Sequence, residues 1–378
     1  MTVNTTPVSA GQALATLKSL WDAQKEHGIK VSSMMWGRPG IGKTQVAEQL
    51  ANYIGGKLYD VRLTTIDTSD LRGLPYYDHD TKTTMWYRPE DLPNDSAPAV
   101  LFLDELSSAP AHIQPTVYGL LQERRVGQHK IPDNVIIVAA GNGVADGAVA
   151  YEMGTAIADR LIHLQVVASP EDWIKNFAVP ANLHPAVIAF VKTAPQHFET
   201  TEACMKQDNL IACTPRSWER VSQLMKSIKD PKVRRIAVAG TIGDAVASDF
   251  FMVADDLEAT VQVLEMLKKP RKDRMAMVPA NMFGLNAMTF GLVGAADSEN
   301  ILQVMEVFAD LADTKTFLAG RSETDRKELA KQPLKELATY GMESLMTKII
   351  ADQKMIEKVI VSDIYRQYTA ERKAAGLE

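Results

Sequence analysis

The sequence predicts an α/β protein in which helices cover both faces of a parallel five-stranded sheet and a further helical region follows. Five short segments with the pattern of strands, which alternate with stretches of helical periodicity, are the first observation. They cover residues 31–36, 57–65, 98–106, 134–142 and 160–168. The third run is apolar without interruption, as in a strand buried on both faces. After residue 169 the helical pattern continues with almost no strand pattern.

The first strand and its flanking helices follow from the local sequence. Residues 8–27 predict a helix that Ser9 caps, because apolar side chains recur at helical spacing from Ala13 to Trp21. The run "VSSMMW" (31–36) then ends at a glycine-rich stretch, which favours a strand followed by a loop. In "KTQVAEQLANYI" the apolar residues again recur at helical spacing, so a helix follows the loop.

The remaining elements alternate in the same way. Between the second and third strands, "IDTSDLRGLPYYDHDTKTTMWYRPEDLP" predicts a helix interrupted by a hairpin. "IQPTVYGLLQER" predicts a helix between the third and fourth strands, with Pro115 near its start. From these patterns we expect an α/β core over residues 1–168, a helical lid over 169–230 and a separate helical region over 231–378.

Length and composition indicate an ordinary globular protein of two or three domains. The chain has 378 residues, 46% hydrophobic and 23% charged, and a formal net charge of −6. This acidic balance gives no indication of nucleic acid or an anionic membrane as partner. No apolar run approaches the length of a membrane span, and residues 1–13 lack the pattern of a signal peptide. The only cysteines, Cys204 and Cys213, fit no zinc pattern, so we expect a reducing, cytoplasmic location.

The stretch "GRPGIGKT" has the spacing of a loop that binds nucleotide phosphates. Its glycines let backbone N–H groups curl around a phosphate, and the next helix presents its positive N-terminus. Lys43 is expected to reach the β- and γ-phosphates, and the Thr44 hydroxyl to bind Mg²⁺. The residues expected to hold the nucleotide are Gly37, Pro39, Gly40, Ile41, Gly42, Lys43, Thr44 and Gln45.

Two carboxylates follow the third strand, in "VLFLDE". Asp104, at the tip of a buried strand near the phosphate loop, is suited to Mg²⁺ coordination. Glu105 can orient and polarise a water for attack on the γ-phosphate. A kinase would also need an acceptor site, so the pair favours a nucleotide hydrolase.

Three further polar residues are weaker candidates. Asn142 ends the fourth strand, where its amide can hold the attacking water or simply form a turn. Arg160 precedes the fifth strand, and Arg216 begins a predicted lid helix after Pro215. An arginine near the γ-phosphate stabilises transition-state charge, although isolated arginines are more often surface ion-pair partners.

Taken in order, "GRPGIGKT", "LFLDE", "AAGN", "ADR" and "TPRSW" resemble Walker A, Walker B, sensor 1, arginine finger and sensor 2 of an AAA+ ATPase. The branch resembles MoxR, and within it the subgroup of CbbQ and NorQ. "TSDLRGLPYY" with "WYRPEDLP" is similar to the helix 2 insert of that subgroup. "GLLQERRVGQHKIPDNVIIVAAGN" is similar to its segment leading into sensor 1. The resemblance covers about residues 9 to 225.

The resemblance implies an ATP hydrolase that uses Mg²⁺ and assembles as a ring, usually a hexamer. Glu105, Asn142, Arg160 and Arg216 would be catalytic, with Arg160 reaching the neighbouring subunit's nucleotide, and Thr44 and Asp104 would bind the metal. Such proteins remodel or activate a protein partner, often by assisting metal insertion, beside a protein with a von Willebrand factor A domain. ATP rather than GTP follows from this resemblance alone.

Two other functions stay open at this point. One is a nucleic-acid-directed motor of the McrB or helicase kind, which the acidic balance and the lack of a DNA-binding motif disfavour. The other is a scaffold that hydrolyses ATP slowly as a timer. The aromatic residues of the insert also allow two interpretations, since Tyr76, Tyr77, Trp86 and Tyr87 could grip a polypeptide or pack their own hairpin.

Overall fold

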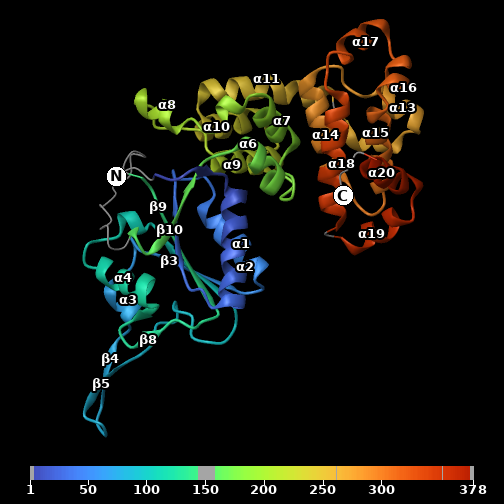
Figure 1. Cartoon of the computed structure of the whole chain (residues 1–378). Helices are drawn as coiled ribbons and strands as arrows, with labels where there is room; N and C mark the ends of the chain where they lie inside the picture. Colours follow the sequence, from blue (N-terminus) through green and yellow to red (C-terminus); the bar gives the residue numbers. More distant parts are fainter. Residues whose placement is uncertain (1–3, 144–157, 261, 351, 375–378) are drawn as a thin grey trace. The chain divides into compact units, whose positions relative to one another are not determined.

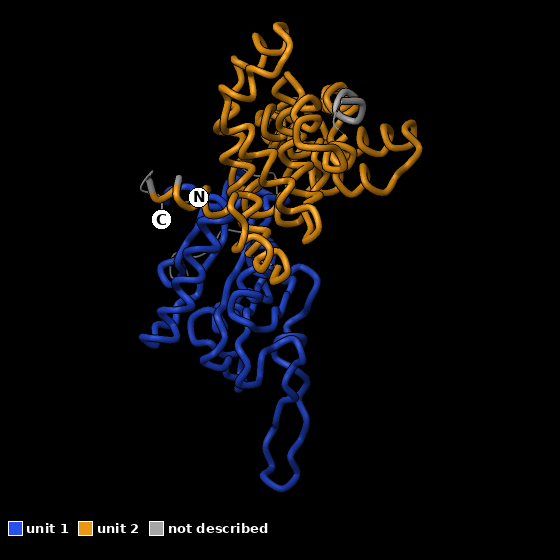
Figure 2. The backbone as a smooth tube through the Cα atoms, turned by 90° about the vertical axis from the view of Figure 1, so that its right-hand side faces the viewer, with its two compact units in different colours: residues 1–169 blue, residues 170–378 orange. Residues whose placement is uncertain are grey.

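The computed structural model describes residues 4–143, 158–260, 262–350 and 352–374. The chain divides into two compact units, Met1–Ser169 and Pro170–Glu378, which Figure 2 distinguishes by colour. No described helix has both the length and the apolar character needed to cross a membrane.

The first unit is built on a parallel six-stranded sheet in the order β1-β10-β2-β9-β6-β3. The strands are β1 (Pro7–Val8), β2 (Ser32–Trp36), β3 (Lys57–Arg62), β6 (Ala99–Asp104), β9 (Val135–Gly141) and β10 (Leu161–Val166). The five predicted strands and the fold class are therefore confirmed. The expected count of five was one too low, because β1 has only two residues and is too short to carry an alternating pattern.

Helices cover both faces of this sheet (Figure 1). The helices are α1 (Ala10–His27), α2 (Lys43–Tyr53), α3 (Thr68–Arg72) and α4 (Gln114–Glu123). Ser9 caps α1 in a reciprocal arrangement with Gln12, as its sequence predicted. Alternate residues of β6 serve the two faces: Phe102 packs in the core with α1 and α2, whereas Leu103 packs in the core with α4.

Two hairpins interrupt this regular arrangement. The predicted insert after α3 is the pair β4 (Pro75–Asp78) and β5 (Thr83–Trp86), which extends from the edge of the first unit (Figure 1). A smaller hairpin, β7 (Arg125–Val126) and β8 (His129–Lys130), follows α4. Together they place a long projecting ribbon and a short turn on the same unit as the phosphate loop.

The second unit contains no strand among its described residues. Its helices are α6 (Pro170–Trp173), α7 (Pro185–Thr193), α8 (Thr201–Lys206), α9 (Pro215–Ser227), α10 (Pro231–Ile242), α11 (Asp244–Thr260), α12 (Val263–Lys268), α13 (Arg271–Ala276), α14 (Met282–Ala295), α15 (Ile301–Ala312), α16 (Thr314–Ala319), α17 (Glu323–Leu329), α18 (Leu334–Ile350), α19 (Gln353–Ile360) and α20 (Asp363–Ala374). A π-helical segment, Ile174–Ala178, follows α6.

The apolar helix α14 lies at the centre of the second unit, where it contacts α7, α11, α12 and α18. Its residues from Gly284 to Val293 are all buried. None of them is charged, as is typical of a helix enclosed on every side. Helices from both sides of residue 230 thus belong to one compact unit. The division into a lid over 169–230 and a separate region over 231–378 stays a prediction.

His184 is a buried, neutral side chain at the start of α7. Its Nδ1 accepts a hydrogen bond from the backbone N–H of Ala186 at 3.3 Å, which caps the helix. Burial, reinforced by the positive charges of Lys226 and Arg234, lowers the pKa of His184 to about 4. The folded protein therefore resists protonating this ring, whereas the unfolded chain protonates it near pH 6.5.

His184→Asn is expected to weaken the acid sensitivity of the second unit. The pKa of His184 is lowered in the folded protein. Its contribution to the stability of the folded state is therefore complete above about pH 6.5 and is lost as the pH falls toward 4. When the pH falls from 7.5 to 5, protonation of the His184 ring in the unfolded chain should lower the wild-type free energy of unfolding by about 2 kcal/mol. Asparagine keeps the capping acceptor and does not titrate. Urea unfolding at both pH values measures the difference, and equal losses for both proteins would contradict the assignment.

Candidate nucleotide-binding site

The phosphate loop joins β2 to α2 and depends on its glycines. Gly40 and Gly42 have positive φ angles of 80° and 102°, which side chains with a Cβ rarely adopt. Gly37 donates its N–H to the carbonyl of Gly141 at 3.2 Å, which continues the pairing of β2 with β9. A Cβ on Gly37 would lie 2.5 Å from the backbone oxygen of Val166. Only glycine therefore allows the loop this close approach to β10.

The N-terminus of α2 faces this loop without a side-chain cap, because Gly42 stands at the capping position. The helix has 11 residues, so its first N–H groups and its dipole favour an anion there. Lys43 is only 9% exposed, and its Nζ donates to the carbonyls of Gly37 at 2.5 Å and Arg38 at 3.1 Å. An uncapped helix end beside a fixed ammonium group fits the phosphates of a nucleotide.

Asn142 is the predicted residue that the structure places most directly in this site. Its Oδ1 accepts a hydrogen bond from Nζ of Lys43 at 2.9 Å, and its backbone N–H donates to Oγ of Ser107 at 2.9 Å. Ser107 is buried in the 3₁₀ turn Leu106–Ser108, directly after the acidic pair. The end of β9 is thus connected to the lysine on one side and to the acidic segment on the other.

The acidic pair stands at the end of β6, as predicted. Asp104 is 9% exposed, and its Oδ1 accepts the backbone N–H of Glu105 at 2.9 Å. Glu105 has a left-handed backbone (φ 59°, ψ 33°), which is uncommon for a residue other than glycine and needs surrounding contacts to offset its strain. Two successive carboxylates at this strand end can divide the roles, one binding a metal while the other holds a water.

Two residues of the neighbouring strand region, which sequence reasoning missed, contact these carboxylates. Thr64 donates its hydroxyl to Oε2 of Glu105. Arg62, the last residue of β3, lies 3.8 Å from Oδ2 of Asp104 and 3.9 Å from Oε1 of Glu105. No local sequence pattern identifies them, because their position follows from the pairing of β3 with β6, which sets Arg62 opposite Asp104. Both hold Glu105 in place through its oxygens.

Arg160 and Arg216 belong to other elements than the residues described so far. Arg160 is exposed and directly precedes β10, so it stands at the amino end of a strand whose carboxyl end lies beside the phosphate loop. Nearby, His163 accepts a hydrogen bond from the indole of Trp36 at 2.8 Å, and its other nitrogen lies 2.8 Å from the carbonyl of Ala158. Arg216 is exposed in the first turn of α9, in the second unit.

The donor set fits Mg²⁺ with a nucleotide. Thr44 is a half-buried hydroxyl in the first turn of α2, and Asp104 supplies a carboxylate at the end of β6. Among the described residues, no group of three or more His, Cys, Asp or Glu side chains is placed to hold a metal ion by itself. Two protein ligands are what Mg²⁺ requires where phosphate oxygens complete its shell.

Comparison with known proteins supports the same interpretation of the first unit. Residues 32–161 match the AAA domain of the dynein-related subfamily, which covers about a third of the chain. A search of curated protein sequences found no match.

The chain also resembles solved structures at low identity. A candidate ATPase from Cytophaga hutchinsonii is 14% identical with a TM-score of 0.33, covering 76% of each chain. One mutant of Thermotoga maritima RuvB is 15% identical with a TM-score of 0.38, covering 76% of this chain and 85% of that one. Another mutant of the same RuvB is 15% identical with a TM-score of 0.36, covering 74% and 81%. These values are too low to indicate a shared activity.

The match to residues 32–161 contains every element of the site just described, from β2 through the acidic pair to the end of β9. These residues therefore form an AAA domain of the dynein-related subfamily, and the protein is an ATP hydrolase.

Proposed function

We propose that the protein is a ring-forming ATPase of the MoxR type, which couples ATP hydrolysis to remodelling, activation or metal-insertion assistance of a protein partner. A hexamer and a partner with a von Willebrand factor A domain are part of this proposal. One observation carries it: the position of Arg160, which cannot serve the nucleotide of its own subunit.

The strand register gives the distance. Leu161 pairs with Ser32 and Gln165 pairs with Trp36, so Arg160 lies six residues behind the level of Gly37. Along parallel strands this is about 20 Å, longer than an arginine side chain can bridge. An exposed arginine at the opposite end of the sheet can be reached by a second subunit. Assembly into a closed ring would give each nucleotide such an arginine.

Within one subunit, the remaining groups have separate roles. ATP with Mg²⁺ supplies the γ-phosphate that water attacks. Thr44 and Asp104 hold the metal, and Lys43 neutralises phosphate charge. Glu105, fixed by Thr64 and Arg62, accepts the proton of the attacking water, while Asn142 lies beside Lys43 to orient groups at the γ-phosphate.

The β4–β5 hairpin supports a polypeptide as the partner. Leu74, Tyr77 and Tyr87 are 65%, 77% and 62% exposed, although Tyr87 also stacks on Tyr76 with ring centroids 4.3 Å apart. Tyr76 and Tyr87 therefore pack on each other in the hairpin, whereas Tyr77 faces solvent and is available to a polypeptide. Exposed aromatic side chains on a projecting ribbon suit contact with another protein.

The densest basic stretch of the sequence, "LKKPRKDR" (267–274), is where a nucleic acid could bind, and two of its five cations are engaged within the second unit. Arg271 forms an ion pair with Asp310, and the buried Arg274 forms one with Glu306 at 2.7 Å. Both arginines thus join α13 to α15 within the second unit. A phosphate backbone would have to compete with these internal carboxylates.

Tyr77→Ser is expected to reduce the response to a polypeptide without changing basal ATP turnover. A reduced, carboxymethylated, permanently unfolded protein should stimulate the wild-type ATPase, and loss of the exposed ring should reduce that stimulation several-fold. Steady-state phosphate release measures both rates.

Tyr53→Ser is the matched control, since Tyr53 is 49% exposed in the same unit but lies at the end of α2. Salt-sensitive stimulation by DNA, with none by the polypeptide, would instead favour the motor. Slow ATP turnover that neither the polypeptide nor DNA stimulates would favour the scaffold. Co-purification from the source cell then identifies the natural partner.

A further inference from the structure

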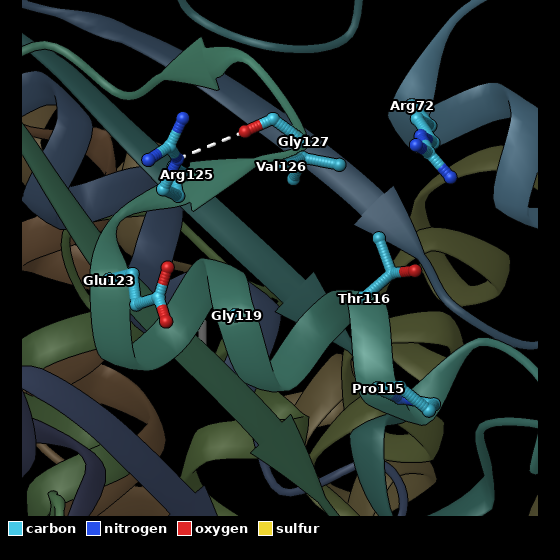
Figure 3. A pocket seen from close by; sticks show the side chains of 8 residues that line it. All are labelled: Arg72, Pro115, Thr116, Gly119, Glu123, Arg125, Val126 and Gly127. Carbon is cyan, nitrogen blue, oxygen red and sulfur yellow. Dashed lines mark hydrogen bonds between the residues drawn. The ribbon is translucent and has the colours of Figure 1, made fainter.

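A cavity of about 350 Å³ lies between α4, the end of α3 and the β7–β8 hairpin of the first unit (Figure 3). Its lining includes Arg72 at the end of α3, Thr116, Gly119 and Glu123 on one face of α4, and Arg125 with Gly127 in the small hairpin. None of these residues belongs to the nucleotide site. The volume falls within the range that holds a small ligand or one or two side chains.

Contacts other than ion pairs hold both guanidinium groups of this cavity. The guanidinium carbon of Arg72 lies 4.3 Å from the ring centroid of Trp86. Nε of Arg125 donates to the carbonyl of Gly127 at 2.9 Å. Among the residues that the structure describes, neither arginine has an ion-pair partner. Two pre-positioned, unpaired guanidinium groups at one cavity are suited to a planar anion.

The cavity is joined firmly to the projecting hairpin. The ring of His129 in β8 lies within 3.1 Å of the carbonyl of Arg72. Gln128 donates to the carbonyl of Trp86 at 3.1 Å, and Arg88 donates to the carbonyl of Lys130 at 3.0 Å. The contacts of Gln128 and Arg88 tie the small hairpin to the base of the large one, and the contact of His129 ties it to the end of α3. A group bound in the cavity would therefore be held by segments that are hydrogen-bonded to the base of the β4–β5 hairpin, which carries the exposed Tyr77.

We propose that this cavity binds a carboxylate group of a polypeptide partner, between Arg72 and Arg125. The proposal rests on the proposed function, because it names a contact of the protein that the ring would act on. Glu123 lines the same cavity and adds a negative charge, and a phosphate chain has no cation to offset it. A peptide can place a lysine beside its carboxylate and satisfy Glu123 as well. The carboxylate can belong to an acidic side chain or to a chain end.

Arg125→Gln is the primary test, measured as the fluorescence anisotropy of labelled 12-residue peptides with the full-length protein and a non-hydrolysable ATP analogue. A peptide of Gly, Ser, Glu and Lys is expected to bind wild type at least about tenfold more tightly than the variant, because a charge-assisted bond is lost. Changing the Glu residues of the peptide to Gln should produce a similar loss. If amidation of the peptide's C-terminus weakens binding and the Glu-to-Gln changes do not, the bound carboxylate is the chain terminus.

Arg72→Lys is a second variant, which keeps the charge but loses the forked geometry, and should weaken binding less than Arg125→Gln. Lys25→Gln, an equal change of charge on the exposed end of α1, should leave binding unchanged. Equal binding by wild type and Arg125→Gln, no binding by wild type, or tighter binding of a labelled oligo-dT would each overturn the proposal. Basal ATP turnover, measured in the same samples, should be unchanged, which separates this site from the ATPase itself.

Discussion

Glu105→Gln is expected to bind ATP as wild type does and to hydrolyse it at least about 100-fold more slowly, because a positioned general base contributes about that much. Glutamine has the same size and can still accept the hydroxyl of Thr64 through its carbonyl oxygen. It has no negative charge to take a proton from water. Binding depends on the phosphate loop and α2, which this change does not touch.

Two measurements separate binding from hydrolysis in this variant. Titration with a fluorescent ATP analogue gives the affinity, and single-turnover phosphate release gives the chemical rate. Glu26→Gln, at an exposed position near the end of α1, is the matched control and should change neither. Wild-type hydrolysis by the Glu105 variant would show that another group takes the proton. Loss of binding would show that the left-handed turn at Glu105 supports the phosphate loop.

Much of the first unit could be predicted because its sequence signals are local. An uninterrupted apolar run as short as residues 98–103 is typical of an inner strand buried on both faces. The glycines, Lys43 and the acidic pair follow strands directly, so predicting the strands also places them at one edge of the sheet. Asn142 was ambiguous in the sequence, and its hydrogen bond to Lys43 favours the functional interpretation over a simple turn.

The rest depends on neighbours that are distant in the sequence. Arg62 and Thr64 acquire a role only because β3 pairs with β6, a pairing that no pattern within either strand specifies. The left-handed turn at Glu105 is held by contacts rather than by residue preference. The cavity beside Arg72 forms where α3, α4 and a two-residue hairpin meet, and such short strands carry no periodic signal.

Arg160→Ala is expected to hydrolyse ATP at least about 100-fold more slowly on its own, and to recover part of this activity when mixed with Glu105→Gln. An arginine supplied in trans stabilises transition-state charge by this much or more. In a mixed ring, a Glu105→Gln subunit offers its intact Arg160 to the nucleotide of an Arg160→Ala subunit, which retains its intact Glu105. That interface alone contains both groups, so activity should peak at intermediate ratios.

The ratio dependence makes this test specific for a shared site. Turnover is measured across a series of mixing ratios, with subunit exchange confirmed by energy transfer between differently labelled variants. Arg220→Ala, an arginine on α9 without an assigned role, should hydrolyse ATP normally and show no gain on mixing. If mixed rings form and activity stays flat, Arg160 does not act across the interface. The distance of about 20 Å along β10 and β2 excludes its own site as the alternative, so the arginine would then be structural.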